Sequence, residues 1–109
     1  MNREILGRLK KISERLKKNY NAEKVILFGS YARGEETEDS DVDLLVVMRN
    51  KVAPGQQVVE IRKALADLPI AKDIIVVSPE YFEHFRDVVG TVVWPALREG
   101  RVLYERRAA

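Results

Sequence analysis

The sequence contains no cysteine, one histidine and one tryptophan among its 109 residues. The lack of cysteine excludes disulfide bonds and thiolate metal sites, and a reducing compartment is the natural expectation. The first residues, MNREILGRLKK, alternate charged and apolar positions and contain no uninterrupted apolar segment. We therefore expect neither a signal peptide nor a membrane span, and we expect a cytoplasmic protein without a membrane partner.

Histidine-dependent chemistry is also poorly supported. The single histidine, His84, lies beside Phe82 and Phe85 in a predicted amphipathic helix. A surface or packing role is more common for such a residue than metal ligation. No histidine base lies near a candidate serine nucleophile, so the sequence does not favour a hydrolase of the Ser-His type.

Charge is distributed unevenly along the chain, although the net charge is only +2. Residues 1–20 carry seven basic side chains and two acidic ones, whereas residues 35–43 carry six acids and no base. A solvated helix face and a surface loop account for both segments. Nucleic-acid binding by the basic segment stays open as an alternative, and it predicts binding that weakens steeply with salt.

Hydrophobic periodicity predicts one α+β domain over residues 1–109, with a small mixed sheet of three to four strands flanked by helices. Apolar residues recur at steps of three and four over residues 3–19, which is typical of an amphipathic helix. The expected strands cover residues 24–28, 41–48, 70–77 and 101–105. The other expected helical segments cover residues 30–34, 56–68, 80–88 and 91–100.

Local signals mark where these elements begin and end. KVAPG, at 51–55, is expected to break the chain, and Pro69 is expected to end a helix at Leu68. Ser78 and the proline after it are typical of a capped helix start. Gly90 is expected to interrupt the following helix. Pro95 could open another turn, and Gly100 could supply a left-handed helix end.

Asp41 and Asp43 interrupt a segment, DVDLLVVM, that otherwise resembles a buried strand. Placing ionised groups beside apolar neighbours costs several kcal/mol each unless a cation or hydrogen bonds compensate. Alternation along a strand places both carboxylates on one face, with Cα atoms about 7 Å apart. Both could then bind the same one or two cations, and Mg²⁺ is favoured because it prefers hard oxygen ligands.

Asp73 supplies a possible third carboxylate, because it begins another apolar segment, AKDIIVV. If the two strands are neighbours, three carboxylates converge at one edge of the sheet. The alternative is that Asp73 only marks the surface entry of its strand. Its place beside two other strand acids favours the shared site.

Gly29 and Ser30 form a turn between the first strand and the short helical segment. A glycine there lets the backbone approach a ligand closely, and the following amides and the serine hydroxyl could hold phosphate. Arg33 could add a charged contact to phosphate. Capping of its own turn, or an ion pair with Glu35 or Glu36, is an equal alternative for this arginine.

The segments GSYARG, at 29–34, and SDVDL, at 40–44, resemble the signature of the minimal nucleotidyltransferases, small members of the DNA polymerase beta nucleotidyltransferase superfamily. The later strand acid Asp73 also matches. The order of helices and strands resembles the compact, palm-like fold of that family over the whole chain. The resemblance implies that the nucleotide-binding residues include Gly29, Ser30, Arg33 and Ser40.

The same resemblance implies that Asp41, Asp43 and Asp73 are catalytic metal ligands for one or two Mg²⁺ ions. Asp73 would also orient or deprotonate the attacking hydroxyl. The implied reaction is in-line attack of a hydroxyl on the α-phosphate of a nucleoside triphosphate, with ATP as donor and pyrophosphate as leaving group.

Stand-alone modules that resemble this chain commonly pair with a HEPN-domain protein as toxin and antitoxin. In such systems the transferase attaches AMP to a tyrosine of the HEPN toxin. The resemblance therefore implies a HEPN-domain partner, and nucleic acid is not expected as the direct substrate. The alternative is a non-catalytic antitoxin that neutralises its partner by occlusion and retains the acids only as a nucleotide or metal site.

Overall fold

Four strands form one mixed sheet in this computed structural model, which describes residues 1–49 and 54–106. The strands are β1 (Lys24–Phe28), β2 (Val42–Val47), β3 (Lys72–Val77) and β4 (Arg101–Glu105). Their order across the sheet is β3-β2-β1-β4, with β1 antiparallel to β2 and β4, and with β2 parallel to β3. The predicted α+β class with a small mixed sheet is confirmed.

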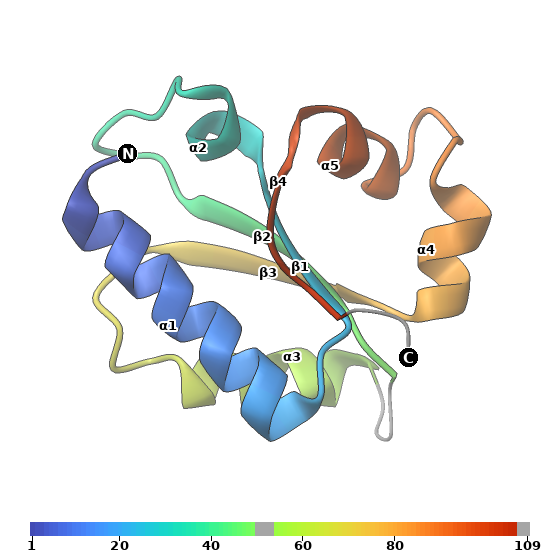
Figure 1. Cartoon of the computed structure of the whole chain (residues 1–109), viewed down its shortest axis with the longest axis horizontal. Coiled ribbons are helices and arrows are strands. Elements are labelled where there is room, and N and C mark those ends of the chain that lie inside the picture. The colour runs from blue at the N-terminus through green and yellow to red at the C-terminus, as the bar shows by residue number, and fades with distance from the viewer. Residues whose placement is uncertain (50–53, 107–109) are drawn as a thin grey trace.

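Helices cover both faces of the sheet (Figure 1). On one face, α1 (Arg3–Tyr20) and α3 (Pro54–Ala64) bury residues such as Leu9, Ile12 and Ile61 against it. On the other face, α4 (Pro79–Phe85) and α5 (Val93–Glu99) contribute Phe82, Val93 and Ala96 to a second core. Because both faces are covered, β2 is almost entirely apolar after its first two residues.

The long helix α1 forms as its periodicity predicts, and both of its ends are capped. The side chain of Asn2 accepts a hydrogen bond from the backbone amide of Ile5 at 2.9 Å, which typically stabilises a helix by about 1 kcal/mol. At the other end, Asn21 takes a left-handed conformation with φ 54°. No helix among the described residues is long and apolar enough to cross a membrane.

The helix α3 differs from its predicted boundaries at both ends. It begins at Pro54, inside the segment expected to break the chain, and residues 51–53 of that segment lie outside the described residues. It ends at Ala64, before the predicted end at Leu68. The carbonyl of Ala64 accepts a hydrogen bond from Arg15 Nη1 at 3.0 Å, and the amide of Leu68 donates instead to Leu65 at 3.1 Å. The chain therefore tightens into turns before Pro69.

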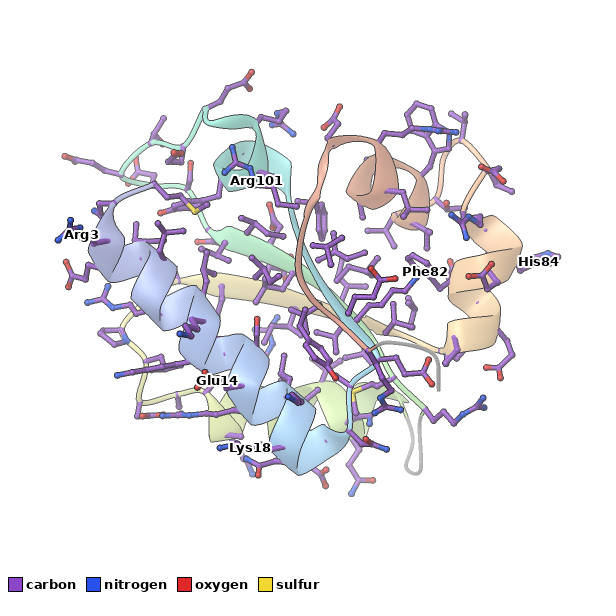
Figure 2. All side chains as sticks on the ribbon, in the orientation of Figure 1. Arg3, Glu14, Lys18, Phe82, His84 and Arg101 are labelled. Carbon is purple, nitrogen blue, oxygen red and sulfur yellow. The ribbon has the colours of Figure 1, made fainter. Side chains whose placement is uncertain are left out.

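The two C-terminal helices begin as their serine and proline signals predict, but the first of them ends earlier than predicted. Ser78 caps α4 by accepting a hydrogen bond from the amide of Tyr81 at 3.0 Å. The helix stops at Phe85, three residues earlier than expected. Pro95 lies in the first turn of α5, where its missing N–H costs no helix hydrogen bond. His84 is exposed and points away from the sheet on the outer side of α4 (Figure 2), as expected for a surface residue.

The prediction of a left-handed end at Gly100 is wrong. This residue has φ −77° and ψ 164°, because the chain passes directly into the extended conformation of β4. Glycine is required there for lack of space. A β-carbon would lie 2.7 Å from Cγ2 of Ile26 and 2.9 Å from the carbonyl oxygen of Leu27, which is too close for either neighbour.

Candidate active site

The short helix α2 (Gly29–Arg33) begins directly at the end of β1. Gly29 makes this turn with φ +73°, a conformation that other residues rarely adopt. The space beside its Cα is filled by the carboxylate of Asp43. A β-carbon at position 29 would overlap Oδ2 of Asp43 and lie 3.1 Å from its Cγ. The predicted phosphate-binding turn and the acidic strand are therefore in direct contact.

The strand register brings two of the three predicted acids together. Asp43 is the partner of Asp73 across the parallel β2–β3 pair, and it is the partner of Phe28 across the β1–β2 pair. Paired residues on adjacent strands project on the same face, with strands about 4.8 Å apart. Asp43 and Asp73 thus lie side by side, as predicted if the two strands were neighbours.

Asp41 is exposed and comes just before β2, whereas Asp43 is partly buried within it. Burial raises the pKa of Asp43 above its ordinary value, and the nearby charges of Asp73 and Asp41 raise this pKa further. Arg33 opposes this shift. The site therefore concentrates negative charge, which a cation would relieve.

Asp73 is also engaged by a residue that the sequence analysis did not identify. Arg62, on α3, donates a hydrogen bond from Nη2 to Oδ1 of Asp73 at 3.1 Å, and both side chains are about half exposed. Within residues 1–49 and 54–106, no three Asp, Glu or His side chains are grouped closely enough to hold one metal ion. The structure thus places Asp43 beside Asp73 but does not bring all three acids to one point.

The predicted phosphate ligands lie around this turn but differ in their contacts. Arg33 forms ion pairs with Glu35 at 3.2 Å and with Glu99 of α5 at 3.3 Å. The pairing with Glu35 was one of the two alternatives for this residue. The hydroxyl of Ser40 accepts a hydrogen bond from the amide of Thr37 at 2.8 Å and thereby closes the acidic loop ahead of Asp41. Ser30 is partly buried at the second position of α2.

Arg62 and Glu99 form ion pairs with candidate site residues, and no sequence pattern predicted either of them. Arg62 lies on α3, 11 residues before its partner Asp73, and Glu99 lies on α5, 66 residues after its partner Arg33. Each looks like an ordinary charged position on a helix surface. No spacing rule connects either residue with the acidic strand.

The donor set suits Mg²⁺, because every candidate ligand is a carboxylate oxygen. The raised pKa of Asp43 agrees with this, because burial and then the charges of Asp73 and Asp41 disfavour its ionised form, and a bound cation would favour that form. Asp41 and Asp43 would hold the ion. Asp73 could join them only if it released Arg62.

The model of the nucleotidyltransferase domain family matches residues 9–93, which include the turn at Gly29 and all three acids. The chain belongs to this nucleotidyltransferase family. The recognition of the family, and of its enzymatic class, is confirmed.

Relatives of this nucleotidyltransferase occur in Methanocaldococcus jannaschii. One, provisionally named protein adenylyltransferase MJ0604, is 37% identical over 98 residues, covering 88% of this chain and 94% of the relative. Another, provisionally named protein adenylyltransferase MJ1379, is 54% identical over 44 residues, 40% of this chain. That second match spans 41% of the relative's length.

Solved structures share the fold of this nucleotidyltransferase. A provisional nucleotidyltransferase from Sulfolobus solfataricus aligns with TM-score 0.61 and 17% identity, over 97% of this chain and 91% of the other. A toxin-antitoxin complex with AMP-PNP aligns with TM-score 0.55 and 18% identity, over 90% of this chain and 74% of that one. At these identities the likeness concerns the fold.

Proposed function

We propose that this nucleotidyltransferase transfers AMP from ATP to a hydroxyl group of a partner protein and thereby acts as an antitoxin. The relative that matches nearly the whole chain is provisionally named as a protein adenylyltransferase, which supports a protein as acceptor. A structural neighbour comes from a toxin-antitoxin structure with AMP-PNP, which supports an adenine nucleotide as donor. In this proposal residues 1–109 act as a single catalytic domain in the cytoplasm.

Asp41 and Asp43 are the proposed ligands of one or two Mg²⁺ ions, and Asp73 joins them when Arg62 turns away. The bound ions supply charge neutralisation for the triphosphate and for the entering and leaving oxygens. Asp73 lies beside Asp43 and is exposed, so it can accept a proton from the attacking hydroxyl and hold that oxygen in line with the α-phosphate.

The proposed nucleotide site lies at the turn that starts α2. Gly29 leaves room for close approach to the backbone there, and Ser30 offers a hydroxyl to phosphate oxygens. Arg33 becomes a phosphate contact only by exchanging Glu35 or Glu99 for the nucleotide, which costs little because both ion pairs are exposed. Ser40 contributes by fixing the loop that carries Asp41.

The proposed acceptor is a tyrosine of a HEPN-domain toxin. A structural neighbour of this chain is an antitoxin in complex with a tri-AMPylated HEPN toxin from Shewanella oneidensis. The likeness to that complex, with TM-score 0.51 and 18% identity, concerns the fold. The acceptor residue and the partner therefore belong to the proposal alone.

The contact of Asp43 with Gly29 and its pairing with Asp73 are the observations on which this proposal depends. The test incubates the protein with Mg²⁺, ATP labelled at the α-phosphate and the product of the neighbouring gene. Label should appear on that partner and should vanish with Asp41→Asn or Asp43→Asn. Asp39→Asn, which neutralises an exposed acid of the same loop, is the matched control and should retain labelling.

The second candidate function is neutralisation of the partner by occlusion. It is favoured by the engagement of Asp73 with Arg62, which leaves the three acids ungrouped. In the same experiment, a partner that is inhibited but carries no label would support occlusion and would contradict AMP transfer. The double variant Asp41→Asn/Asp43→Asn would then inhibit the partner as well as the unaltered protein does.

A further inference from the structure

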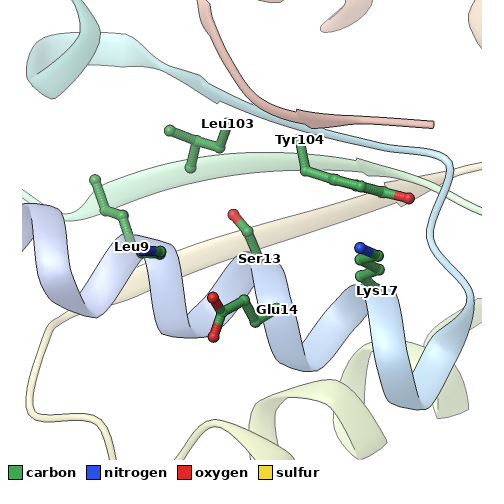
Figure 3. A pocket seen from close by; sticks show the side chains of 7 residues that line it. Leu9, Ser13, Glu14, Lys17, Leu103 and Tyr104 are labelled. Atoms are coloured by element: carbon green, nitrogen blue, oxygen red, sulfur yellow. The ribbon is translucent and has the colours of Figure 1, made fainter. Parts of the chain in front are cut away.

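A cavity of about 300 Å³ lies between α1 and the edge strand β4. Figure 3 shows side chains of both elements converging on it. Apolar groups come from Leu9, Leu103 and the ring of Tyr104, and charged groups come from Lys10, Glu14 and Lys17. The cavity lies on the sheet face that α1 covers, whereas Asp43 and Asp73 project on the opposite face with the second core.

One buried polar group in this cavity lacks a hydrogen-bond partner. Ser13 is 7% exposed, and its Oγ forms no hydrogen bond with any residue that the structure describes. Its side chain points from α1 toward Leu103 and Tyr104 (Figure 3). An unpaired buried hydroxyl typically costs about 1–3 kcal/mol, so a polar atom of a bound molecule would stabilise it.

A β-bulge in β4 shapes the opposite wall. Tyr104 pairs with Val25 and Val102 pairs with Ile26, so Leu103 is an extra residue without a partner of its own. As a result, Leu103 and Tyr104 both pack against the core beneath α1. Two consecutive side chains thus line the same cavity, which a regular strand would not permit.

The charge of the cavity rim is positive. Arg8 and Arg15 of α1 are engaged by Glu4 and Asp67. Lys10 and Lys17 form no ion pair with any described residue, and Lys17 lies over the ring of Tyr104 with Nζ 5.6 Å from its centroid. Glu14 is the only acid among the lining residues, so two ammonium groups face one carboxylate.

We propose that this cavity binds an acidic peptide segment of a protein partner, with an aliphatic side chain on the apolar floor and carboxylates between Lys10 and Lys17. A polar atom of the segment pairs with the Ser13 hydroxyl. Charge complementarity selects acidic residues, and the apolar floor selects a side chain over a bare phosphate. The site uses none of the residues proposed for nucleotide transfer, so its success or failure is independent of that proposal.

A second copy of the chain fits this edge less well. Antiparallel pairing of two β4 strands would set Arg101 opposite Glu105, which looks complementary. The bulge prevents this contact, because it places Arg101 and Glu105 on opposite faces of the sheet. Arg101 pairs with Leu27, and Glu105 pairs with Lys24, whose side chain projects on the other face. Bulges on edge strands oppose such pairing.

The experiment measures amide chemical shifts of the ¹⁵N-labelled full chain on addition of the peptide acetyl-DLELD-amide at about 0.15 M salt. We expect shifts centred on Ser13, Lys17 and Tyr104. The neutral peptide acetyl-NLQLN-amide should bind at least about tenfold more weakly. Equal affinity for the two peptides, or shifts centred on α2 and the acidic loop, would overturn the proposal.

Matched variants test the charge of the rim. Lys10→Gln/Lys17→Gln should weaken binding of the acidic peptide about tenfold. Lys11→Gln/Lys18→Gln has the same spacing and charge change at exposed positions of α1 that do not line the cavity, and it should weaken binding at most about twofold. Glu14→Gln should strengthen binding about threefold. Equal effects of the two lysine pairs would show a general basic surface and would overturn a specific site.

Filling the cavity provides a readout that does not depend on charge. Ser13→Leu should abolish peptide binding, and its folding is checked by the dispersion of the amide spectrum. If that variant does not fold, the charge test with Glu14→Gln on the exposed rim decides the question instead. Tighter binding of a ten-nucleotide single-stranded RNA than of the peptide, or concentration-dependent broadening at β4 without any peptide, would overturn the proposed occupant.

Discussion

The carboxylate of Asp43 occupies the space that a β-carbon on Gly29 would need. The turn that begins α2 and the strand that carries the acids therefore fix each other's position. Glycine is needed at position 29 for two reasons: Asp43 leaves no room for a β-carbon, and other residues rarely adopt the φ of +73°. This contact explains why a glycine directly follows β1, at the start of the proposed nucleotide site.

The first prediction concerns Gly29→Ala. The added methyl group must displace Asp43 and also adopt a strained backbone, so we expect a loss of about 1–3 kcal/mol in the free energy of unfolding and at least about a 100-fold loss of AMP transfer. Gly34→Ala is the matched control, because Gly34 has the same φ of +73° but nothing within 4 Å of the added carbon. Urea unfolding and transfer assays on both variants separate strain from displacement.

Equal losses of transfer in these two glycine variants would contradict the role of the Gly29–Asp43 contact. Backbone strain would then account for both.

The second prediction is that Asp43→Asn stabilises the metal-free protein. Burial and the charges of Asp73 and Asp41 raise the pKa of Asp43 in the folded state, so the ionised group destabilises the fold at neutral pH. We expect Asp43→Asn to raise Tm at pH 7 by about 3 °C. The sign follows from proton binding: the penalty is present above the folded pKa and is absent below the unfolded one, near 4.

The gain from Asp43→Asn should therefore disappear when Tm is measured near pH 3.5. A lower Tm for this variant than for the unaltered protein at pH 7 would show that Asp43 is stabilised by an internal partner.

The third prediction concerns the pair of Arg62 and Asp73. Arg62→Gln frees the Asp73 carboxylate, so less Mg²⁺ should be needed for half-maximal transfer. The exposed ion pair contributes up to about 1 kcal/mol, which corresponds to a reduction of up to about fivefold. Arg86→Gln, which removes an exposed ion pair with Glu83 elsewhere, should leave the Mg²⁺ dependence unchanged. An increased Mg²⁺ requirement in Arg62→Gln would instead make Arg62 part of the working site.

The fourth prediction concerns the junction of α1 with the end of α3. The guanidinium of Arg15 donates hydrogen bonds to Asp67 and lowers the pKa of that carboxyl to about 2. The contribution of the Arg15–Asp67 ion pair to stability is present above the unfolded pKa of Asp67, near 4, and is lost as the pH falls through about 2. Asp67→Asn should therefore lower Tm at pH 7, and this effect should shrink as the pH approaches 2 and be absent below it. A Tm difference that does not change with pH would show that the pair contributes nothing through its charge.

The sequence was sufficient to predict the local structure of the candidate site where that structure depends on short spacings. The alternation of Val42, Asp43 and Leu44 reflects strand geometry, whereas Asp41 lies just before β2. The match of DVDLLVV with AKDIIVV reflects two adjacent strands. The glycine turn was visible because it separates an apolar strand from a short helical segment. Each of these segments is itself shorter than about ten residues, a length over which periodicity is informative.

Other features depend on distant contacts and could not be read from spacing. The early end of α3 coincides with a hydrogen bond from Arg15 to the carbonyl of Ala64, 49 residues away in sequence. Gly100 is needed because Ile26 and Leu27 crowd it, rather than because of its backbone angle. The extra residue in β4 appears only when its register against β1 is known.

The most direct test of the acidic nucleotide site is isothermal titration calorimetry with Mg²⁺ and an ATP analogue that is not cleaved between the α- and β-phosphates. We expect binding that requires Mg²⁺, that weakens at least about tenfold in Asp41→Asn and Asp43→Asn, and that is unchanged in Asp39→Asn. Binding of the analogue with equal affinity to all of these proteins, or no binding to the unaltered chain, would contradict it.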